Sequence, residues 1–274
     1  MNRKQYTAIA FALVGAAALS AQAVVAKDLT VAVYSAFTTL DPYDASDTLS
    51  QNVAKSFYEG LFGFDKNMKL VNVLAESYDV SKDGLEYTIK LKQGIKFSDG
   101  EPFNAAAVKA NFDRVTNPEN HLTRYQLYRN IESVEVVDDA TVKFHLKEAF
   151  SAFINQLAHP SGVMICPKTL ALSKKEVAFN PCGTGPYVLE KYNPAEYLVV
   201  KKNPNYWQKG LPKLDSISFR PVLEDATRVA MLRTGEAQFV DVVPPEHVER
   251  LKETPNIVVD AAPSIVPRQI YLNN

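Results

Sequence analysis

The sequence predicts a mixed α/β fold of the α+β kind, in which β-hairpins and short helices follow one another along the chain. Three observations carry this prediction. Apolar residues alternate with polar ones in short segments such as 29–33 and 214–221, as they do in strands. Turn formers such as Asp83-Gly84 separate neighbouring strands. Capping residues precede segments with helical spacing of apolar residues, as in 104–115.

The N-terminus predicts a secretory signal peptide and therefore a periplasmic protein. Arg3 and Lys4 form a basic head, residues 8–19 are small and apolar, and Ala26 closes a small-residue cleavage site. The apolar run is short for a bilayer span, which favours a signal peptide over a membrane anchor. We expect cleavage after Ala26, with Ala23 as the alternative, and no lipid attachment because no cysteine lies nearby.

Composition points to a soluble globular protein without a nucleic-acid partner. Apolar residues make up 46% of the chain and charged residues 22%. The formal net charge is −1, from 30 basic and 31 acidic residues. Removing Arg3 and Lys4 with the leader leaves 28 basic residues, so the net charge becomes −3. Nucleic-acid binding needs a basic face that displaces counterions, and this charge balance argues against one.

In the first half of the chain, the strand at 29–33 leads to a predicted helix at 48–62. Thr48 and Gln51 have the spacing of a capping box, and Gly60 marks the helix end. A hairpin follows, with Asp83-Gly84 as a tight turn in which both residues need positive φ. The other predicted elements are the hairpin strands, a helix capped by Asn104, a second hairpin and a short helix, at residues 78–80, 87–91, 104–115, 134–146 and 150–158.

In the second half, strands and helices continue to alternate. A helix capped by Asp225 is expected to end at Gly235, and Pro244-Pro245 is expected to open another. The predicted strands of this half are at residues 187–189, 197–200, 214–221, 257–259 and 265–272.

The chain has two cysteines, Cys166 and Cys182. Export to an oxidising compartment favours a disulfide between them, with two buried free thiols as the alternative. Two cysteines without clustered histidine or acidic ligands make a poor zinc site.

A search for catalytic and cofactor motifs favours a binding protein over an enzyme. The histidines are scattered, with no His-Glu-x-x-His pair and no Gly-x-Ser-x-Gly elbow. Gly183-Thr184-Gly185 begins like a phosphate loop, but Pro186 removes an amide donor, so a tight loop before a strand is favoured. We expect no catalytic residues, no metal and no cofactor.

Four motifs, spread in order along the chain, resemble those of a known family. They are Ala75-Glu76-Ser77-Tyr78 through Phe103, Gly183-Thr184-Gly185-Pro186-Tyr187, Asn203-Pro204-Asn205-Tyr206-Trp207 and Arg233-Thr234-Gly235-Glu236-Ala237. The sequence strongly resembles the family 5 extracellular solute-binding proteins, which serve ABC importers for peptides, nickel and glutathione. Within the family, residues 37–45, 48–51, 150–155 and 158–160 are most similar to the glutathione-binding components.

The resemblance implies a type II periplasmic-binding-protein-like lobe, the first of two lobes that close on a ligand. After the signal peptide (1–26), residues 27–70 and 185–274 would form the core subdomain of this lobe. Residues 71–184 would form an inserted subdomain. About half of the family length, including the second lobe, is missing after residue 274, which suggests a fragment or a truncated product.

The resemblance also implies a function. The family member would capture glutathione or a short peptide in the periplasm, as a monomer, and deliver it to an inner-membrane ABC permease. The alternatives are a nickel- or haem-type receptor of the same family and a truncated remnant that does not bind.

Ligand positions also follow from the resemblance, since ligands in this family contact loops between the lobes. In this sequence the matching positions are Ser35, Phe37, Thr38, Ala45, Asp47, Arg124 and Tyr125, with 161–164 as a weaker candidate. The hydroxyls of Ser35 and Thr38 would donate to a peptide carbonyl, and the planar fork of Arg124 would pair with a carboxylate. The competing interpretations are loop capping for the hydroxyls, a solvated charge for Arg124 and core packing for Tyr125.

Overall fold

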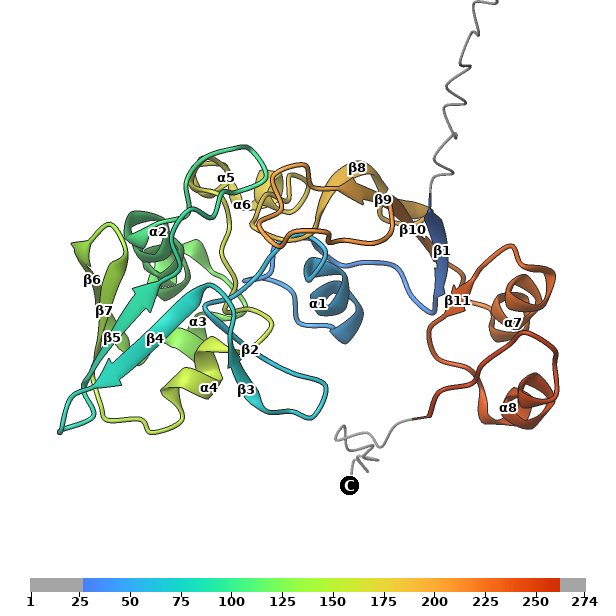
Figure 1. The fold of residues 1–274 in the computed structure, drawn as a ribbon, viewed down its shortest axis with the longest axis horizontal. Helices are drawn as coiled ribbons and strands as arrows, with labels where there is room; N and C mark the ends of the chain where they lie inside the picture. Colours follow the sequence, from blue (N-terminus) through green and yellow to red (C-terminus); the bar gives the residue numbers. More distant parts are fainter. Residues whose placement is uncertain (1–26, 262–274) are drawn as a thin grey trace, which may run out of the picture.

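Residues 27–261 are described in a computed structural model of the protein (Figure 1). The predicted signal peptide and the predicted strand at 265–272 lie outside these residues. The strands are β1 (Asp28–Val33), β2 (Phe62–Phe64), β3 (Leu70–Asn72), β4 (Ala75–Val80), β5 (Glu86–Leu91), β6 (Ile131–Asp138), β7 (Thr141–Leu146), β8 (Tyr187–Asn193), β9 (Tyr197–Lys202), β10 (Ser216–Pro221) and β11 (Phe239–Val240). The helices are α1 (Thr48–Ala54), α2 (Ala105–Thr116), the 3₁₀ turn η1 (Pro118–Asn120), α3 (Tyr125–Tyr128), α4 (Phe153–Leu157), α5 (Pro167–Leu170), α6 (Lys174–Val177), α7 (Asp225–Thr234) and α8 (Pro245–Lys252).

The larger sheet has five strands in the order β11-β1-β10-β9-β8. β1 is parallel to β10 and β11, whereas β10–β9 and β9–β8 are antiparallel. Its register aligns Leu29, Ile217, Val200 and Leu189 in one row across four strands. All four side chains belong to the hydrophobic core or pack against it, and this burial fixes the register.

The four-stranded sheet, called the smaller sheet below, is antiparallel, in the order β4-β5-β7-β6, and lies at the left of Figure 1. Strands β2 and β3 form a separate two-stranded antiparallel sheet. Helix α2 packs against β6 and β7. Phe112 of this helix meets Phe144 of β7 edge to face, with ring centroids 4.9 Å apart, and Phe144 in turn contacts Phe153 of α4. Such aromatic pairs bury large apolar areas, so they hold the helices on the sheet.

Most buried apolar side chains form one continuous core that runs from the smaller sheet to the larger one. A small second cluster of Ala32, Met231 and Ala237 attaches α7 to β1. The four-stranded and five-stranded sheets come from different stretches of sequence, 75–146 and 28–33 with 187–240. The subdomain boundaries at residues 70 and 184 stay a prediction. Among residues 27–261, no helix has both the length and the apolarity needed to cross a membrane.

Both predicted hairpins are confirmed, as β4–β5 and β6–β7. The α2 cap is also confirmed, because Asn104 accepts a hydrogen bond from the backbone N–H of Ala107 at 3.0 Å. The prediction for the first hairpin turn was wrong in one respect. Of the pair Asp83-Gly84, only the glycine has positive φ (73°). The reason is that five residues, 81–85, connect β4 and β5, and the turn is closed by a hydrogen bond from Gly84 N to the Ser81 carbonyl.

The predicted helix at 48–62 is too long, because α1 ends at Ala54. The carbonyls of Ser56 and Phe57 accept hydrogen bonds from the backbone N–H groups of Tyr187 and Gly185, both at 2.9 Å. A continued helix would need those carbonyls for its own next turn. Strand β8 and the loop before it therefore end the helix, a tertiary effect absent from the local pattern.

Two predicted caps and one predicted strand were also wrong. The N-cap of α1 is Asp47 rather than the capping box at Thr48, and the N-cap of α7 is Glu224 rather than Asp225. In each case the carboxylate one position earlier reaches the free N–H of the first turn. Residues 257–259 are not a strand, and Val258 is 92% exposed, so no neighbouring strand covers it.

Candidate functional site

The candidate site has three parts: the loop 34–47 after β1, Arg124 at the start of α3, and the segment 159–164 after α4. The first loop is held to α1 by side chains. The Thr38 hydroxyl donates to the Asp47 carboxylate, and the backbone N–H of Thr38 donates to Ser50 Oγ at 2.9 Å. Asp47 also caps α1 by accepting from Ser50 N at 2.7 Å. Thr38 and Asp47 are therefore a linked pair.

Hydrogen bonding to Asp47 keeps its carboxylate ionised. Burial raises the pKa of Asp47, but the hydrogen bonds from Thr38 and Ser50 outweigh it and hold the pKa below its ordinary value. The Asp47 charge also acts on the nearby Tyr192, whose pKa is raised to about 12 by burial and by this charge. The loop thus presents a fixed negative charge next to an exposed threonine hydroxyl.

A buried ion pair shapes the middle of the loop. The guanidinium of Arg114, on α2, binds both carboxylate oxygens of Asp41, which is fully buried. Asp41 Oδ1 also accepts from Tyr43 N at 3.0 Å, and the Asp41 carbonyl accepts from the N–H groups of Asp44 and Ala45. Because both charges are paired and hydrogen-bonded, the pair fixes the turn instead of straining it.

Tyr43 joins the loop to the segment 159–164. Its hydroxyl donates to the carbonyl of Val163 at 2.8 Å and lies 3.1 Å from Asn111 Oδ1. Asn111 in turn accepts from Ile165 N and donates to the Ile165 carbonyl, both at 2.9 Å. Tyr43, Asn111, Val163 and Ile165 are all buried, so the two parts of the site are held rigidly together.

Arg124 joins the third part of the site to the loop. Its Nε and Nη2 atoms donate to the carbonyl of Ala45 at 2.9 and 2.7 Å, and its backbone N–H donates to the Tyr43 carbonyl at 3.0 Å. The Nη1 atom has no hydrogen-bond partner among residues 27–261. Ala45 therefore contributes through its carbonyl rather than its side chain, which is buried.

The segment 159–164 begins with a tight turn. His159 to Gly162 is closed by a 2.7 Å hydrogen bond from Gly162 N to the His159 carbonyl, with Pro160 in the second position. The Ser161 hydroxyl lies 2.8 Å from His159 Nδ1 and 3.0 Å from the Tyr128 hydroxyl. Ser161 and Tyr128 are both fully buried, so the turn is fixed from inside.

Three of the predicted residues do not join this cluster. Phe37 is 3% exposed and packs edge to face on Phe219, so it belongs to the core. The Ser35 hydroxyl donates to the carbonyl of Ala36 at 3.3 Å. Tyr125 lines a separate hollow of about 610 Å³, together with Arg129 and neighbouring residues.

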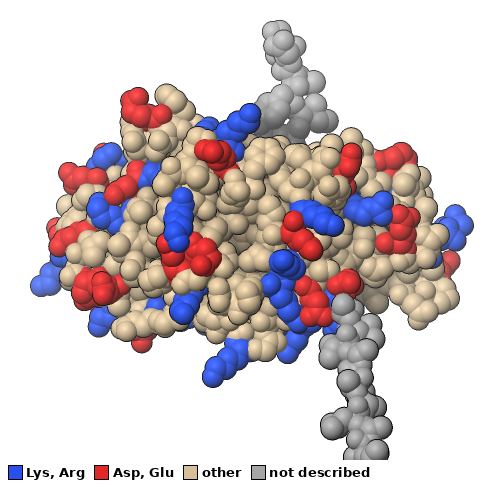
Figure 2. Space-filling view, turned by 90° about the horizontal axis from the view of Figure 1, so that it is seen from above, with Lys and Arg blue, Asp and Glu red and all other residues tan. Residues whose placement is uncertain are grey.

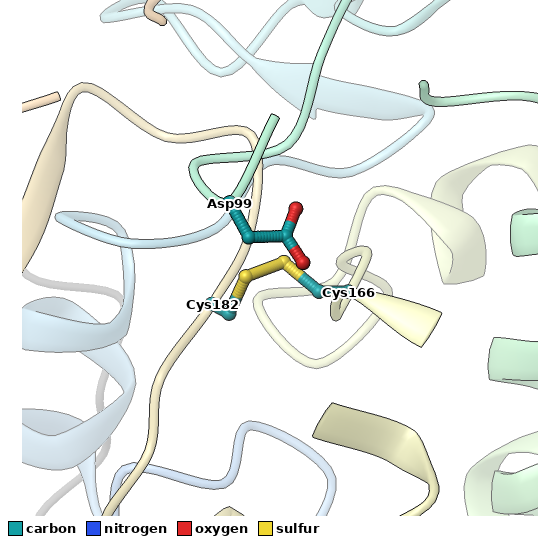
Figure 3. Close-up of side chains that lie close together, drawn as sticks. All are labelled: Asp99, Cys166 and Cys182. Atoms are coloured by element: carbon teal, nitrogen blue, oxygen red, sulfur yellow. A yellow bond between two sulfur atoms is a disulfide. The ribbon is translucent and has the colours of Figure 1, made fainter. Parts of the chain in front are cut away.

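The cysteines form the disulfide that was predicted, Cys166–Cys182, with Cα atoms 5.3 Å apart. Figure 3 shows that the Asp99 carboxylate lies beside it. These three residues are the only group of three close potential metal ligands among residues 27–261. Because both sulfurs are in the disulfide, neither is available as a thiolate ligand.

Two of the motifs that suggested the family meet at a residue that the sequence analysis missed. The Glu59 carboxylate accepts hydrogen bonds from Thr184 Oγ1 at 3.0 Å, Tyr206 Oη at 2.9 Å and Trp207 Nε1 at 2.7 Å. Burial raises the pKa of Glu59, and these hydrogen bonds only partly offset it. Glu59 lay inside the overlong predicted helix, where nothing distinguished it from an exposed helical residue.

The glycines of Gly183-Thr184-Gly185 allow close packing of backbones. A Cβ atom on Gly185 would lie 2.5 to 2.7 Å from backbone atoms of Phe57 and Tyr58. This contact supports the interpretation as a tight loop before a strand.

The site also includes His159, Tyr128 and Ser50, which were not among the predicted ligand residues. The dipeptide His159-Pro160 was the available signal, because proline favours the second position of such a turn.

On the face shown in Figure 2, acidic and basic side chains of the described residues are interspersed, without a large area of one sign.

Comparison with known proteins decides the family. The family described as "Bacterial extracellular solute-binding proteins, family 5 Middle" matches residues 69–274. The chain belongs to the family 5 bacterial extracellular solute-binding proteins. The predicted resemblance is thus confirmed.

Curated members of family 5 are similar over nearly the whole chain. A glutathione-binding protein GsiB from Salmonella typhi is 61% identical over 251 residues, which cover 92% of this chain and 49% of the relative. The GsiB of Escherichia coli O157:H7 is 58% identical over 260 residues, covering 95% of this chain and 51% of the relative. The chain therefore spans about half the length of the curated relatives that it matches.

Solved structures similar to the chain confirm the fold as a type II periplasmic-binding-protein-like lobe. The periplasmic binding protein DppA from Helicobacter pylori, in complex with the peptide STSA, has a TM-score of 0.78 and 28% identity. NikZ from Campylobacter jejuni, in complex with Ni(L-His), has a TM-score of 0.74 and 29% identity. The matches cover 85% and 84% of this chain and 50% and 46% of those chains.

Proposed function

We propose that this chain is the ligand-facing part of a periplasmic receptor that captures glutathione or a short peptide and delivers it to an inner-membrane ABC permease. The observation that carries the proposal is the 61% identity to a glutathione-binding protein over 251 residues. The receptor acts by binding and release, without catalysis. The predicted signal peptide supports export to the periplasm.

The site geometry supports the same proposal. The Thr38 hydroxyl is at an exposed position, and the Arg124 guanidinium is fixed on the Ala45 carbonyl with one nitrogen left for a ligand. A guanidinium in this state suits a carboxylate. The Thr38 hydroxyl donates its proton to Asp47, so it is left to accept a hydrogen bond from a peptide N–H group. Glutathione and short peptides contain both carboxylates and peptide N–H groups. Because these residues supply one wall, full affinity needs the half of the receptor that the chain does not span.

The test is calorimetry on two proteins. One is the mature chain, residues 27–274, and the other is the same chain continued by the second half of the Salmonella typhi relative, called the completed receptor below. We expect the completed receptor to bind glutathione and the mature chain to bind it much more weakly. Metal content measured on both proteins tests the nickel- or haem-type alternative. A folded completed receptor that binds no peptide would favour the non-binding remnant.

A further inference from the structure

The Cys166–Cys182 disulfide closes a short segment that packs on the loop 34–47 of the candidate site. Within this segment, Lys174 Nζ lies 3.0 Å from Asp44 Oδ1 of the loop. The loop also donates a backbone hydrogen bond of 3.3 Å to the segment. Reduction of the disulfide would free the two ends of the segment, so the oxidised state of the cysteines supports the loop of the site.

The two sulfurs of the disulfide differ in their access to solvent. Cys166 is fully buried and Cys182 is half-buried, so a small thiol in solution reaches only Cys182. In thiol–disulfide exchange, the attacking thiolate forms a bond to one sulfur, the S–S bond breaks, and the electron pair leaves on the other sulfur. Attack on Cys182 therefore gives a mixed disulfide at Cys182 and a thiolate at Cys166.

The Asp99 carboxylate places a negative charge beside both sulfurs. A carboxylate oxygen and the two sulfurs all lie within 4.8 Å of one another, and Figure 3 shows the carboxylate directed toward the disulfide. Asp99 forms no salt bridge among residues 27–261, and Lys168, two residues after Cys166, pairs with Glu101 at 2.7 Å instead. The attacking thiolate and the thiolate that leaves on Cys166 are both negative, so the carboxylate opposes the reaction at its start and at its end.

The hydroxyl that could stabilise a thiolate is bound to the other sulfur. Ser98 Oγ donates to Cys182 Sγ at 3.3 Å, whereas Cys166 Sγ accepts no side-chain hydrogen bond from the described part of the chain. This hydrogen bond would help Cys182 to leave, but that route requires attack on the buried sulfur of Cys166. One direction of exchange is therefore blocked by burial, and the other is opposed by charge.

We propose that the Asp99 carboxylate protects the Cys166–Cys182 disulfide from reduction by small thiols. The inference goes beyond the proposed function, because it concerns any thiol in solution and needs no bound ligand. It also has a consequence for that function. Glutathione is itself an anionic thiol, so a receptor that captures it meets a reductant whose charge the carboxylate repels.

Asp99→Asn tests the charge and keeps the local turn. Asp99 Oδ1 accepts a hydrogen bond from Glu101 N at 3.1 Å, and the amide oxygen of asparagine can accept the same bond. The matched control is Asp79→Asn, which makes the same change of charge at an exposed position of β4, outside this cluster. The proteins are the oxidised mature chains, residues 27–274.

The measurement is the second-order rate constant of disulfide reduction, expressed per thiolate, with free cysteines trapped by alkylation and counted by mass spectrometry. We expect glutathione to reduce Asp99→Asn about fivefold faster than wild type, and Asp79→Asn to react like wild type. Cysteamine carries an ammonium group that the Asp99 carboxylate attracts, so its rate should rise much less in Asp99→Asn. Equal rates for Asp99→Asn and wild type overturn the inference. Equal increases with both thiols also overturn it, because they would indicate a loosened turn instead of a lost charge.

A second measurement needs no variant. The neutral hydroxyethyl disulfide serves as a reference that has no carboxylate beside it. We expect cysteamine to be favoured over glutathione more strongly with the wild-type chain than with the reference, and we expect 0.5 M salt to reduce the difference by screening. The same ratio of rates for both disulfides would overturn the inference. Neither measurement requires glutathione to bind, so a failure of the proposed function is distinguishable from a failure of this inference.

Discussion

The guanidinium of Arg124 donates two hydrogen bonds to the backbone carbonyl of Ala45, at 2.9 and 2.7 Å. These residues are 79 positions apart in sequence, and the contact fixes the start of α3 against the loop after β1. An arginine that is already anchored loses little side-chain freedom when a ligand binds. The same contact therefore contributes to the fold and prepares the site.

Substitution of Arg124 by lysine is expected to weaken both properties. Lysine cannot donate two parallel hydrogen bonds to Ala45 and leave a further donor in the same plane. We expect glutathione affinity of the completed receptor to fall at least about tenfold and the free energy of unfolding to fall by about 1–2 kcal/mol. Calorimetry measures the glutathione affinity, and urea unfolding measures the free energy of unfolding. Arg129→Lys, at the exposed C-cap of α3, is the matched control. Equal effects at both positions would contradict the anchoring role.

Substitution of Glu59 by glutamine is expected to change how stability depends on pH. The folded pKa of Glu59 is raised above its ordinary value of 4.5, chiefly by burial. The folded state therefore holds the proton more tightly than the unfolded state, and the free energy of unfolding falls as pH rises from 4.5 through the raised pKa. Glu59→Gln does not ionise, so this fall should be absent. Urea unfolding between pH 4 and pH 8 measures the difference.

The matched control for this prediction is Glu176→Gln, because the pKa of Glu176 is shifted in the opposite direction to that of Glu59. Hydrogen bonds from Ser173 lower the pKa of Glu176 below 4.5. Its contribution is present above pH 4.5 and is lost as pH falls through the lowered pKa. Parallel pH curves for wild type and Glu59→Gln would show that the Glu59 carboxylate does not titrate with a raised pKa.

Removal of the disulfide is expected to lower stability without abolishing the fold. Cys166 and Cys182 are 16 positions apart, and closing a loop of this length stabilises by about 3 kcal/mol in the chain-entropy model. We expect the double substitution Cys166→Ala with Cys182→Ala to lower the free energy of unfolding by about this amount, as measured in urea. Dithiothreitol should destabilise wild type and leave the double variant unchanged. A double variant as stable as oxidised wild type would refute the prediction.

The sequence was sufficient to predict elements whose signals are local. The β4–β5 and β6–β7 hairpins, the Asn104 cap and the glycine end of α7 all depend on residues within a few positions of one another. The end of α1 was not predictable in this way. It is set by backbone hydrogen bonds from Gly185 and Tyr187, which lie more than 120 positions away.

The candidate site also contains residues that the sequence indicated and residues whose surroundings come from distant segments. Thr38, Asp47 and Arg124 were predicted from the family resemblance, and their role as ligand residues stays a prediction. The structure joins Thr38 to Asp47 and Ser50, and Arg124 to the Ala45 carbonyl of the same loop. Glu59 and His159 were missed because their surroundings come from distant segments. The three donors to Glu59 belong to residues 184, 206 and 207. The Ser161 hydroxyl that contacts His159 is itself hydrogen-bonded to Tyr128 of α3.

Calorimetry with glutathione on the completed receptor tests the central claim most directly. We predict binding with a dissociation constant on the order of 1 μM for the completed receptor. For the mature chain alone we predict binding at least about 100-fold weaker, since one wall of the cleft buries only part of the ligand. A folded completed receptor that gives no heat with glutathione or dipeptides, while the Salmonella typhi relative binds in parallel, would contradict the claim.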